Sequence, residues 1–455
     1  MTRKSAKTVF ECESCGYRSP KWLGKCPSCG GWDTFTEQKA LSEGPSRLKI
    51  ASGKSFVEPL SEIRTEGYLR QKTGFSELDR TLGGGMVPGS VNLIGGEPGI
   101  GKSTILLQIA GNLSLNNITT FYVTGEESKA QIKSRADRLK ISQESISITT
   151  ETDISTVLGE IDRAKPTLVV IDSIQTMYEP EIGSYPGTVG QIRESAAACI
   201  EYAKKNDTIF ILSGHITKEG VIAGPKVLEH MVDTVLYFEG DKDFLYRIIR
   251  GVKNRFGAAG EIGVFEMRSD GLAEVEDPSG VFLSSDEERT GSVVMPMMEG
   301  SRPFLIEVQA LAVPSGYSVS QKVSVGFDSK KLSLISAICE KKANLHLGGM
   351  DIFVKILGGV KAEEAAVDLP VAMALFSSVH DLKMSPNMAV FGELGLSGEV
   401  RGASNPERRV AEALRMGFDK ILLPEPNKAH INNLGGVEII GVRHIQRAFE
   451  AISSL

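Results

Sequence analysis

The sequence predicts an α/β protein made of a small cysteine-rich module followed by two larger units in which strands and helices alternate. Four of the six cysteines fall between positions 12 and 29. A complete phosphate-binding loop occupies residues 96–103, directly after a short apolar segment. Apolar strands then alternate with helical segments to about residue 287, and the alternation resumes after residue 291. Such alternation is typical of a parallel sheet covered by helices on both faces.

The composition is that of an ordinary globular protein. Of the 455 residues, 41% are hydrophobic and 24% are charged, and the formal net charge is −6. This acidic balance excludes a uniformly basic nucleic-acid coat, although it leaves room for a local basic channel. No apolar run is long enough to cross a bilayer, and the basic N-terminus lacks the apolar stretch of a secretory signal. We therefore expect a cytoplasmic protein with no membrane partner.

The cysteine module contains two Cys-x-x-Cys pairs separated by ten residues. Each pair presents two thiolates to a metal ion, and two pairs complete a tetrahedron. We interpret residues 1–37 as a structural zinc module, with a redox pair or unrelated free thiols as the alternative; the expected Zn²⁺ ligands are Cys12, Cys15, Cys26 and Cys29. The only tryptophans, Trp22 and Trp32, also lie here, and for them we favour packing within the module over stacking on a base. Cys199 and Cys339 stand alone, without an assigned role.

The remaining chain divides into a polar linker, a nucleotide-binding core and a second α/β unit without a phosphate loop, at residues 38–67, 68–287 and 291–455. In the core we expect strands at 91–94, 121–123, 168–171 and 209–212, and helices at 104–110 and 128–139. In the second unit we expect strands at 304–313 and 352–357, and helices at 329–342, 368–379 and 408–416.

The phosphate loop fills every fixed position of the G-x-x-x-x-G-K-S pattern. Its glycines let backbone N–H groups point at phosphate oxygens, Lys102 reaches the β- and γ-phosphates, and the Ser103 hydroxyl ligates Mg²⁺. The N-terminus of the following helix also favours an anion. We therefore predict a site for ATP and Mg²⁺ formed by Gly96, Glu97, Pro98, Gly99, Ile100, Gly101, Lys102, Ser103 and Thr104.

ATP hydrolysis also requires a second acid near Mg²⁺ and a group that orients the attacking water. Asp172 ends an apolar strand 70 residues after Lys102, which suits the first role. Glu126 follows a strand that we expect beside the loop strand, and it is our candidate general base, with Glu127 as the fallback. The alternative for both glutamates is an acid stabilised by a helix N-terminus.

His215 lies past the end of another strand and is a candidate γ-phosphate sensor, although a lone histidine is often structural. The glycine-rich segment after it contains Lys218 and Lys226. These lysines suit a loop that contacts nucleic acid, with simple solvation as the alternative.

A distinctive pentapeptide follows the core strands, Lys253-Asn254-Arg255-Phe256-Gly257. Together with the cysteine module, the GEPGIGKST loop, the strand ending in Asp172 and the GHITKEG segment, it makes the chain resemble the bacterial RadA (Sms) family of DNA-repair ATPases over essentially its whole length. The resemblance implies a core like RecA and the DnaB-type helicases, in which a basic-x-Arg pair reaches the γ-phosphate of the neighbouring subunit. Carried over here, the trans-acting residues are Lys253 and Arg255. Taken alone, the pentapeptide is equally compatible with a charged hairpin.

The second unit resembles the proteolytic domain of Lon, which uses a serine activated by a lysine. The serine position falls on Ala366 and the lysine position on Glu407, so the resemblance implies a scaffold without peptidase activity. The family's paired arginines, which offer a basic surface to DNA, are replaced by Gln321-Lys322. Possible substitutes, or simply a solvated helix face, are Lys330, Lys331, Lys341 and Lys342.

The resemblance as a whole implies a Mg²⁺-dependent, DNA-stimulated ATPase of homologous recombination and repair. The expected partners are single-stranded and branched DNA, a RecA-type recombinase and further copies of the chain in a hexameric ring that acts as a helicase in branch migration or D-loop extension. A nucleotide-gated DNA-binding platform without translocation and an ATP-dependent serine peptidase remain as alternatives.

Overall fold

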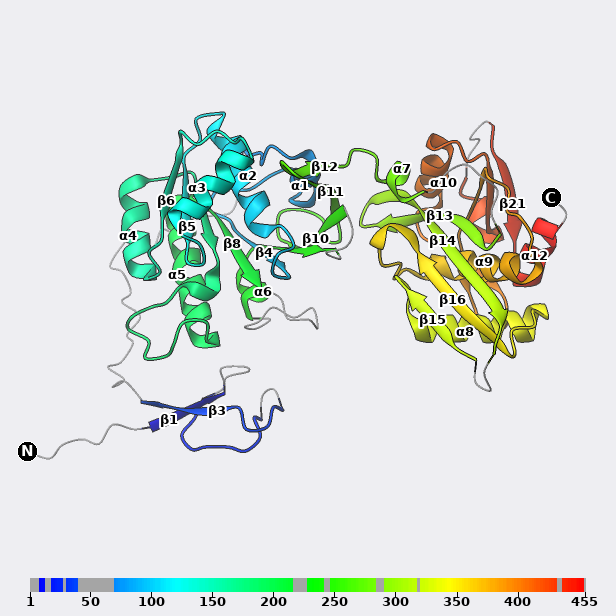
Figure 1. Ribbon diagram of the computed structural model, residues 1–455, viewed down its shortest axis with the longest axis horizontal. Coiled ribbons are helices and arrows are strands. Elements are labelled where there is room, and N and C mark those ends of the chain that lie inside the picture. Colours follow the sequence, from blue (N-terminus) through cyan, green and yellow to red (C-terminus); the bar gives the residue numbers. More distant parts are fainter. Residues whose placement is uncertain are drawn as a thin grey trace, which may run out of the picture. The chain divides into compact units, whose positions relative to one another are not determined.

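A computed structural model describes residues 8–12, 18–27, 30–39, 69–215, 227–240, 246–283, 290–316, 320–431 and 436–453. The chain forms two compact units, Met1–Glu239 with Arg247–Glu274, and Gly240–Tyr246 with Val275–Leu455 (Figure 1). This division falls earlier in the chain than the boundary near residue 287 expected from the sequence. The short helix α7 (Pro278–Phe282) accordingly packs on strand β14 (Arg302–Pro314) of the second unit.

The N-terminal module is a three-stranded antiparallel sheet in the order β2-β1-β3, formed by β1 (Thr8–Cys12), β2 (Arg18–Ser19) and β3 (Phe35–Lys39). Its small core contains Cys12, Cys26 and Phe35, with Phe10 and Leu23 packed against them. A core of this size supplies little burial energy, so the module needs another source of stability.

The first unit continues with a nine-stranded sheet in the order β12-β11-β10-β9-β4-β8-β7-β5-β6. Six strands are parallel: β4 (Val91–Gly96), β5 (Thr120–Thr124), β6 (Ile146–Thr149), β7 (Leu168–Asp172), β8 (Ile209–His215) and β9 (Thr234–Glu239). The predicted strands and the α/β fold class are confirmed. At one edge, however, β10 (Tyr246–Asn254) runs antiparallel to β9, and β11 (Ile262–Arg268) pairs antiparallel with β12 (Gly271–Glu274).

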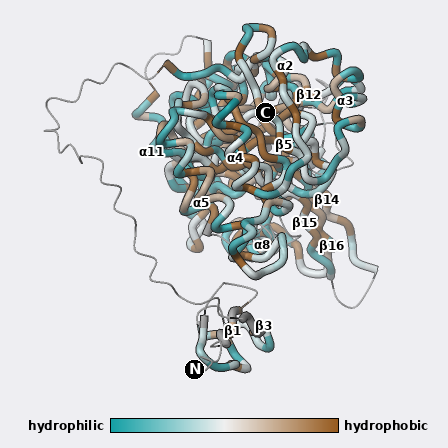
Figure 2. The backbone as a smooth tube through the Cα atoms, turned by 90° about the vertical axis from the view of Figure 1, so that its left-hand side faces the viewer, coloured by the Kyte–Doolittle hydropathy of each residue, from teal (hydrophilic) through white to brown (hydrophobic). Residues whose placement is uncertain are grey.

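Helices cover both faces of this sheet, because side chains of successive strand residues enter two different apolar clusters. Val170 and Ile211 belong to one cluster with residues of α2 (Lys102–Ser114) and α3 (Lys129–Arg138). Val169 and Phe210 belong to the other; it includes residues of α4 (Ile154–Ala164), α5 (Val189–Asn206) and α6 (Val227–Met231). In Figure 2 the central strands are largely brown, whereas the surface helix α3 is largely teal.

The predicted start of α3 at Ser128 is confirmed by a capping box. The Ser128 hydroxyl accepts the Gln131 backbone N–H, and the Gln131 side chain accepts the Ser128 backbone N–H. This reciprocal pairing satisfies donors at the helix N-terminus that have no partner within the helix. Among its described residues, the unit also contains α1 (Ser76–Thr81) and the 3₁₀ turn η2 (Ile174–Thr176).

The second unit is built on a seven-stranded mixed sheet in the order β15-β16-β14-β13-β17-β20-β21. Besides β14, its strands are β13 (Ser292–Glu299), β15 (Lys322–Val325), β16 (Met350–Ile356), β17 (Met388–Val390), β20 (Lys420–Pro424) and β21 (Glu438–Val442). A separate hairpin joins β18 (Glu393–Leu394) and β19 (Val400–Arg401). Besides α7, the described helical elements of this unit are α8 (Ser329–Ala343), α9 (Asp368–His380), α10 (Pro406–Arg415), α11 (Glu425–Lys428), α12 (Ile445–Ser453), η3 (Leu357–Gly359) and η4 (Ala365–Val367).

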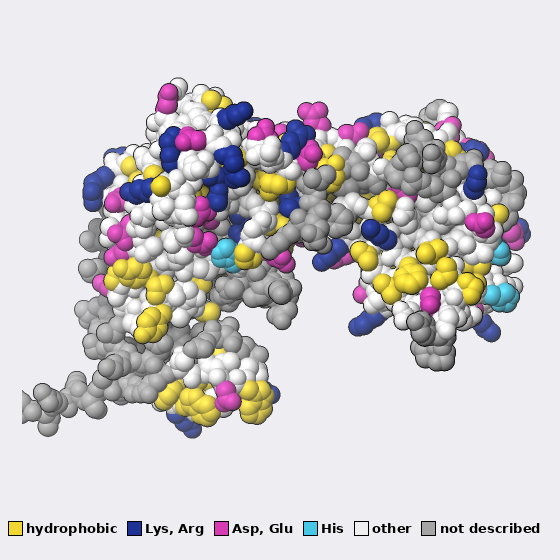
Figure 3. Space-filling view, viewed as in Figure 1, with side chains coloured by type: hydrophobic (Ala, Val, Ile, Leu, Met, Phe, Trp, Pro, Cys, Tyr) yellow, Lys and Arg dark blue, Asp and Glu magenta, His cyan; other side chains and the backbone are white. Residues whose placement is uncertain are grey.

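One face of this sheet exposes hydrophobic side chains at its β15 edge. Leu311 of β14 lies opposite Phe353 of β16, which lies opposite Val323 of β15. These three side chains are 54%, 38% and 43% exposed, and their neighbours Val313 and Val325 are also exposed. We call these five residues the apolar sheet face; hydrophobic side chains over β14 and β16 are visible in Figure 3.

Within the described ranges, no helix combines the length and the apolar character needed to cross a membrane.

Candidate functional site

The phosphate loop connects β4 to α2 at the carboxyl edge of the parallel strands. Gly99 and Gly101 adopt φ angles of 80° and 123°, which side-chain-bearing residues rarely adopt. A Cβ at Gly96 would lie 3.0 Å from the Phe238 side chain, so a larger residue here would be tightly crowded. The buried Arg247 of β10 donates to the Ile100 carbonyl at 3.3 Å. The conformation of the phosphate loop is therefore stabilised by its own glycines and by the Arg247 hydrogen bond from the antiparallel strand β10.

Lys102 lies in the loop with its ammonium folded onto backbone oxygens. Its Nζ donates to the carbonyls of Gly96 and Glu97 at 2.6 and 3.0 Å, and it lies 3.3 Å from His215 Nδ1. Burial lowers the pKa of Lys102, although the negative charges of Asp172 and Glu126 oppose this shift. A nucleotide phosphate would offer charged acceptors in place of neutral carbonyls, and such hydrogen bonds are stronger.

Asp172 ends β7 and is 5% exposed. The hydroxyl of the fully buried Tyr122 donates to Asp172 Oδ2 at 2.9 Å, which fixes the carboxylate orientation. Burial, followed by the Asp172 charge, raises the pKa of Tyr122 well above its usual value, so the phenol stays a donor. A hydroxyl and a carboxylate are oxygen ligands that suit Mg²⁺, so Ser103 and Asp172 fit the predicted ion.

Glu126 follows β5, which does not lie beside the loop strand β4 as the sequence analysis expected, because β8 and β7 lie between them. Glu126 nevertheless faces His215 at the end of β8. Its Oε1 lies 2.7 Å from His215 Nε2 and also accepts the Ser173 hydroxyl. The His215 hydrogen bond, helped by Ser173 and opposed by burial, lowers the pKa of Glu126 to about 2. Glu127 instead forms a 2.8 Å ion pair with Arg135. Of the two glutamates, Glu126 is therefore the one connected to the phosphate loop.

The sequence analysis did not identify Ser173 and Tyr122 as members of this site. Ser173 directly follows Asp172, and strand-end position is the signal that would have found it. Tyr122 is a polar interruption in an apolar strand beside β7, but its contact with Asp172 depends on sheet order.

The pentapeptide 253–257 lies away from its own phosphate loop. Asn254 pairs with Thr234 of β9, which pairs with Asn92 of β4. Gly96, where the loop begins, is four residues further along β4, or about 13 Å at the usual strand rise. Arg255 thus lies at the amino edge of the parallel strands, whereas the loop lies at the carboxyl edge.

The basic residues of the pentapeptide contact the end of α6 and the turn into β9. Lys253 Nζ donates to the carbonyls of Glu229, His230 and Val232 at 2.7, 3.1 and 2.7 Å. Arg255 forms a 3.4 Å ion pair with Asp233, and its side chain is 49% exposed. Burial is the largest cause of a lowered pKa at Lys253, followed by the charge of Arg255.

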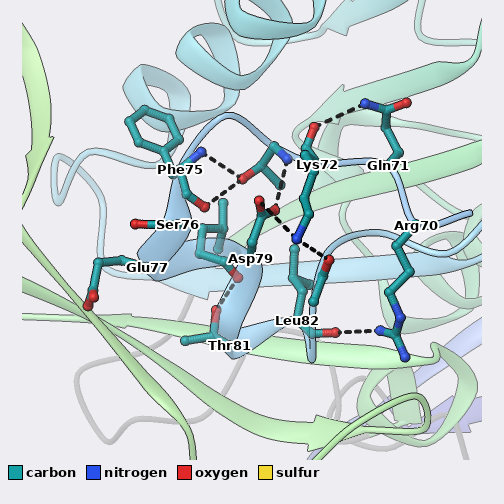
Figure 4. Close-up of polar contacts among 12 residues, drawn as sticks. Arg70, Gln71, Lys72, Phe75, Ser76, Glu77, Asp79, Thr81 and Leu82 are labelled. Carbon is teal, nitrogen blue, oxygen red and sulfur yellow. Dashed lines mark hydrogen bonds and ion pairs between the residues drawn. The ribbon is translucent and has the colours of Figure 1, made fainter.

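The other side of the pentapeptide packs on the segment before β4. Arg70 donates to the Phe256 carbonyl at 2.7 Å and to the Leu82 carbonyl at 3.2 Å; the second contact is drawn in Figure 4. A Cβ at Gly257 would lie 2.9 Å from the Gly83 Cα, so the two backbones touch. These contacts give Phe256 and Gly257 a structural role.

The N-terminal module buries one cysteine from each predicted pair. Cys12 and Cys26 are at most 1% exposed and share one cluster. The Gly30 backbone N–H donates to the Cys26 carbonyl at 2.9 Å, and Gly30 has a φ of 75°, so the chain turns tightly after the second pair. Cys15 and Cys29 lie outside the described residues, as do Lys218 and Lys226. One buried thiol from each pair, in a module with so small a core, fits the zinc site that the sequence predicts.

The packing interpretation of the tryptophans is wrong. Trp22 is 51% exposed and Trp32 is 70% exposed, although the Lys25 ammonium lies 5.4 Å from the Trp32 ring centroid. Their rings are therefore available at the surface of the module. Figure 3 shows hydrophobic side chains on the visible face of this module, beside basic and acidic ones.

In the second unit, the two positions of the expected protease dyad lack suitable side chains. Ala366 is 4% exposed in η4, and Glu407 is exposed at the start of α10. Between the same two elements, the fully buried Arg409 forms an ion pair with Glu364, with one hydrogen bond of 2.8 Å. This pair fastens α10 to the segment before η4, so the region has a structural role.

Only some of the candidate DNA-contacting groups in the second unit are available. Gln321, Lys322, Lys330, Lys341 and Lys342 are exposed. Lys331 instead lies 3.5 Å from Asp368, whose pKa burial raises to about 6.

The phosphate loop at the carboxyl edge of a parallel sheet, with an acid ending β7, two strands from the loop strand β4, defines a P-loop ATPase. Three family models match successive parts of the chain. They are the rubredoxin metal binding domain at residues 10–37, the KaiC ATPase at residues 71–156, and subunit ChlI of Mg-chelatase at residues 333–427.

Full-length relatives define the family. The chain is 45% identical to DNA repair protein RadA of Bacillus subtilis, over 97% of this chain and 98% of the relative. It is also 45% identical to the RadA proteins of Streptococcus pyogenes, over 98% and 99%, and of Listeria monocytogenes, over 99% of both chains. The chain therefore belongs to the RadA family of DNA repair proteins, as the resemblance had indicated.

Proposed function

We propose that this protein is a Mg²⁺-dependent, DNA-stimulated ATPase that binds single-stranded and branched DNA in the cytoplasm. It acts as a hexameric ring helicase in branch migration or D-loop extension, together with a RecA-type recombinase. In this proposal Lys102 binds the phosphates, Ser103 and Asp172 hold Mg²⁺, and Glu126 orients the attacking water. The names of the relatives, which are DNA repair proteins, support the DNA partner.

The observation that carries the proposal is the chain of contacts from Lys102 through His215 to Glu126. His215 lies 3.3 Å from the loop lysine through one ring nitrogen and 2.7 Å from the candidate base through the other. A phosphate that attracts Lys102 would break the first contact and so alter the second. His215 is therefore placed to transmit the presence of the γ-phosphate to Glu126.

Two observations support an assembly of several subunits. Arg255 lies at the edge of the sheet away from its own loop, about 13 Å along the strands, so it suits the site of a neighbour better than its own. The apolar sheet face, centred on Phe353, exposes contiguous hydrophobic side chains of a kind that marks interaction surfaces. We therefore assign the second unit the role of a Lon-like assembly scaffold.

The proposal is tested by measuring ATP turnover with and without single-stranded DNA, for the wild type and for Lys102→Ala. Because Lys102 faces the transferring phosphoryl group, we expect turnover to fall by roughly 10³-fold in the variant. Near-normal turnover would refute the assignment. Unwinding of a forked DNA substrate separates a helicase from a nucleotide-gated platform, because only a motor displaces the strand. Particle images of the same sample count the subunits.

The expected nucleophile position of a peptidase is Ala366, which has no nucleophilic atom. We expect no degradation of casein with ATP present.

A further inference from the structure

We infer that Lys253 acts within its own subunit, as a positioning residue that holds the end of α6, and does not share the trans role of Arg255. The inference rests on the proposed function, because it divides the tasks of two residues that the resemblance placed together at a subunit interface.

The three carbonyls around Lys253 account for its whole hydrogen-bonding capacity. A lysine ammonium has three N–H donors and no acceptor. Glu229, His230 and Val232 provide three carbonyl oxygens within 3.1 Å of Nζ. The last carbonyls of a helix have no partner inside the helix, and a cation there is favoured by the helix dipole. To reach a neighbouring phosphate, Lys253 would have to leave these carbonyls without their partner.

Arg255 is in a different situation, although it is only two residues away. Its guanidinium carries five N–H donors, and its one ion pair among the described residues, with Asp233, is 3.4 Å long. Half of its side chain is exposed. Arg255 can therefore turn toward an incoming anion by giving up one long ion pair, whereas Lys253 would have to give up three carbonyl acceptors.

The helix that Lys253 holds belongs to the connection between two strands of the nucleotide site. In chain order, α6 lies after β8, which ends in His215, and before β9, which pairs with the loop strand β4. Leu228 and Val232 anchor this connection in the core, and Asp233 Oδ2 accepts the Val91 backbone N–H at the start of β4 at 3.0 Å. A change at Lys253 would thus disturb the subunit's own β8–β9 connection without removing a phosphate ligand.

Mixed rings distinguish a residue that acts in its own subunit from one that acts on a neighbour. The test variant is Lys253→Met, which keeps most of the aliphatic stem and removes the donors, and the comparison variant is Arg255→Ala. Each is mixed with Lys102→Ala, whose own site is inactive but whose residues 253 and 255 are intact. We expect each variant alone to lose about tenfold or more of its ATPase activity. On mixing, Arg255→Ala should recover activity where its intact loop meets an intact arginine, whereas Lys253→Met should not. Recovery in the Lys253→Met mixture would overturn the inference.

Hydrogen exchange provides a test that does not depend on hydrolysis. In nucleotide-free protein, the peptide covering α6 should exchange about tenfold faster in Lys253→Met than in the wild type, because the helix end has lost its cap. In Arg255→Ala the same peptide should change much less. Unchanged exchange in Lys253→Met would overturn the inference.

The two tests also separate this inference from the proposed function. If subunits exchange but neither mixture recovers activity, the trans role of Arg255 fails, and the α6 exchange rate alone decides the role of Lys253. Binding of a fluorescent ATP analogue to Lys253→Met verifies that its own phosphate loop is folded.

Discussion

Changing Tyr122 to phenylalanine tests whether Asp172 belongs to the magnesium site. The substitution removes a single hydroxyl and keeps the ring, which is fully buried between strands and helices. That hydroxyl is the donor that orients Asp172 Oδ2, at 2.9 Å. Because Asp172 is 5% exposed, water cannot easily replace the lost donor.

The size of the effect follows from the charge and burial of this hydrogen bond. A hydrogen bond to a charged group contributes about 2 kcal/mol to stability. Loss of a partner that orients a metal-binding carboxylate commonly lowers the affinity for the metal ion by one to two orders of magnitude. If the whole contribution is lost from the Mg²⁺ complex, the half-saturating Mg²⁺ concentration rises roughly thirtyfold. The thermal stability of the first unit should fall as well, since a buried acceptor loses its donor.

The assay is ATP turnover as a function of free Mg²⁺ at saturating ATP. The control is Tyr202→Phe, which removes a hydroxyl from a 3.4 Å surface contact with Asp162 in the same unit and should leave the Mg²⁺ dependence unchanged. Nucleotide binding in the presence of a chelator reports whether the loop of Tyr122→Phe is intact. An unchanged half-saturating concentration in folded Tyr122→Phe protein would refute the role of Asp172 at the metal.

Four further predictions concern other parts of the chain. Wild-type protein should contain one Zn²⁺ per chain by elemental analysis, and Cys12→Ala should release it and unfold the N-terminal module while the ATPase core still melts normally; reduced wild-type protein without zinc would contradict this. Phe353→Asp, in the apolar sheet face, should reduce the assembled mass measured by light scattering and leave nucleotide binding intact; unchanged assembly would exclude this face from the interface. Burial raises the pKa of Asp368 from 3.8 to about 6, although the charge of Lys331 opposes this shift. The folded protein therefore binds the Asp368 proton more tightly than the unfolded chain does, and it loses stability as pH rises from about 4 to 6. Asp368→Asn should therefore be more stable than the wild type at pH 8, by at most about 3 kcal/mol, and the difference should vanish near pH 4 in thermal melts; a difference independent of pH would contradict the assignment. Trp22 and Trp32 are the only tryptophans, so selectively excited tryptophan fluorescence reports on the N-terminal module alone, and single-stranded DNA should quench it if these exposed rings stack on bases; constant tryptophan fluorescence at saturating DNA would contradict base stacking by this module.

Local patterns determined a large part of this protein. The phosphate loop, the strand that ends in Asp172 and the capped start of α3 at Ser128 each depend on residues adjacent in the chain. Glycines at positions of positive φ, an apolar run of strand length and a capping box act within a few residues, so the sequence alone was sufficient to predict them. The family resemblance depended on the same kind of short motif.

The tertiary structure decided which of these groups meet. Glu126 and His215 are 89 positions apart, and their 2.7 Å contact exists because β5, β7 and β8 lie side by side in the sheet. Sheet order is a long-range property, so the sequence could rank Glu126 above Glu127 but could not show which of them contacts His215. The tryptophans show the same limit, because exposure depends on how a whole module packs.

The division between Lys253 and Arg255 was also decided by the fold. Both are basic, they are two residues apart, and the sequence offered no reason to separate them. The antiparallel pairing of β10 with β9 brings Lys253 against the end of α6 and leaves Arg255 half exposed. The sequence by itself determined which chemical groups the chain carries and which local turns present them. Only the tertiary structure decided which of those groups are held and which remain accessible, because hydrogen-bond partners and burial come from segments far apart in the chain.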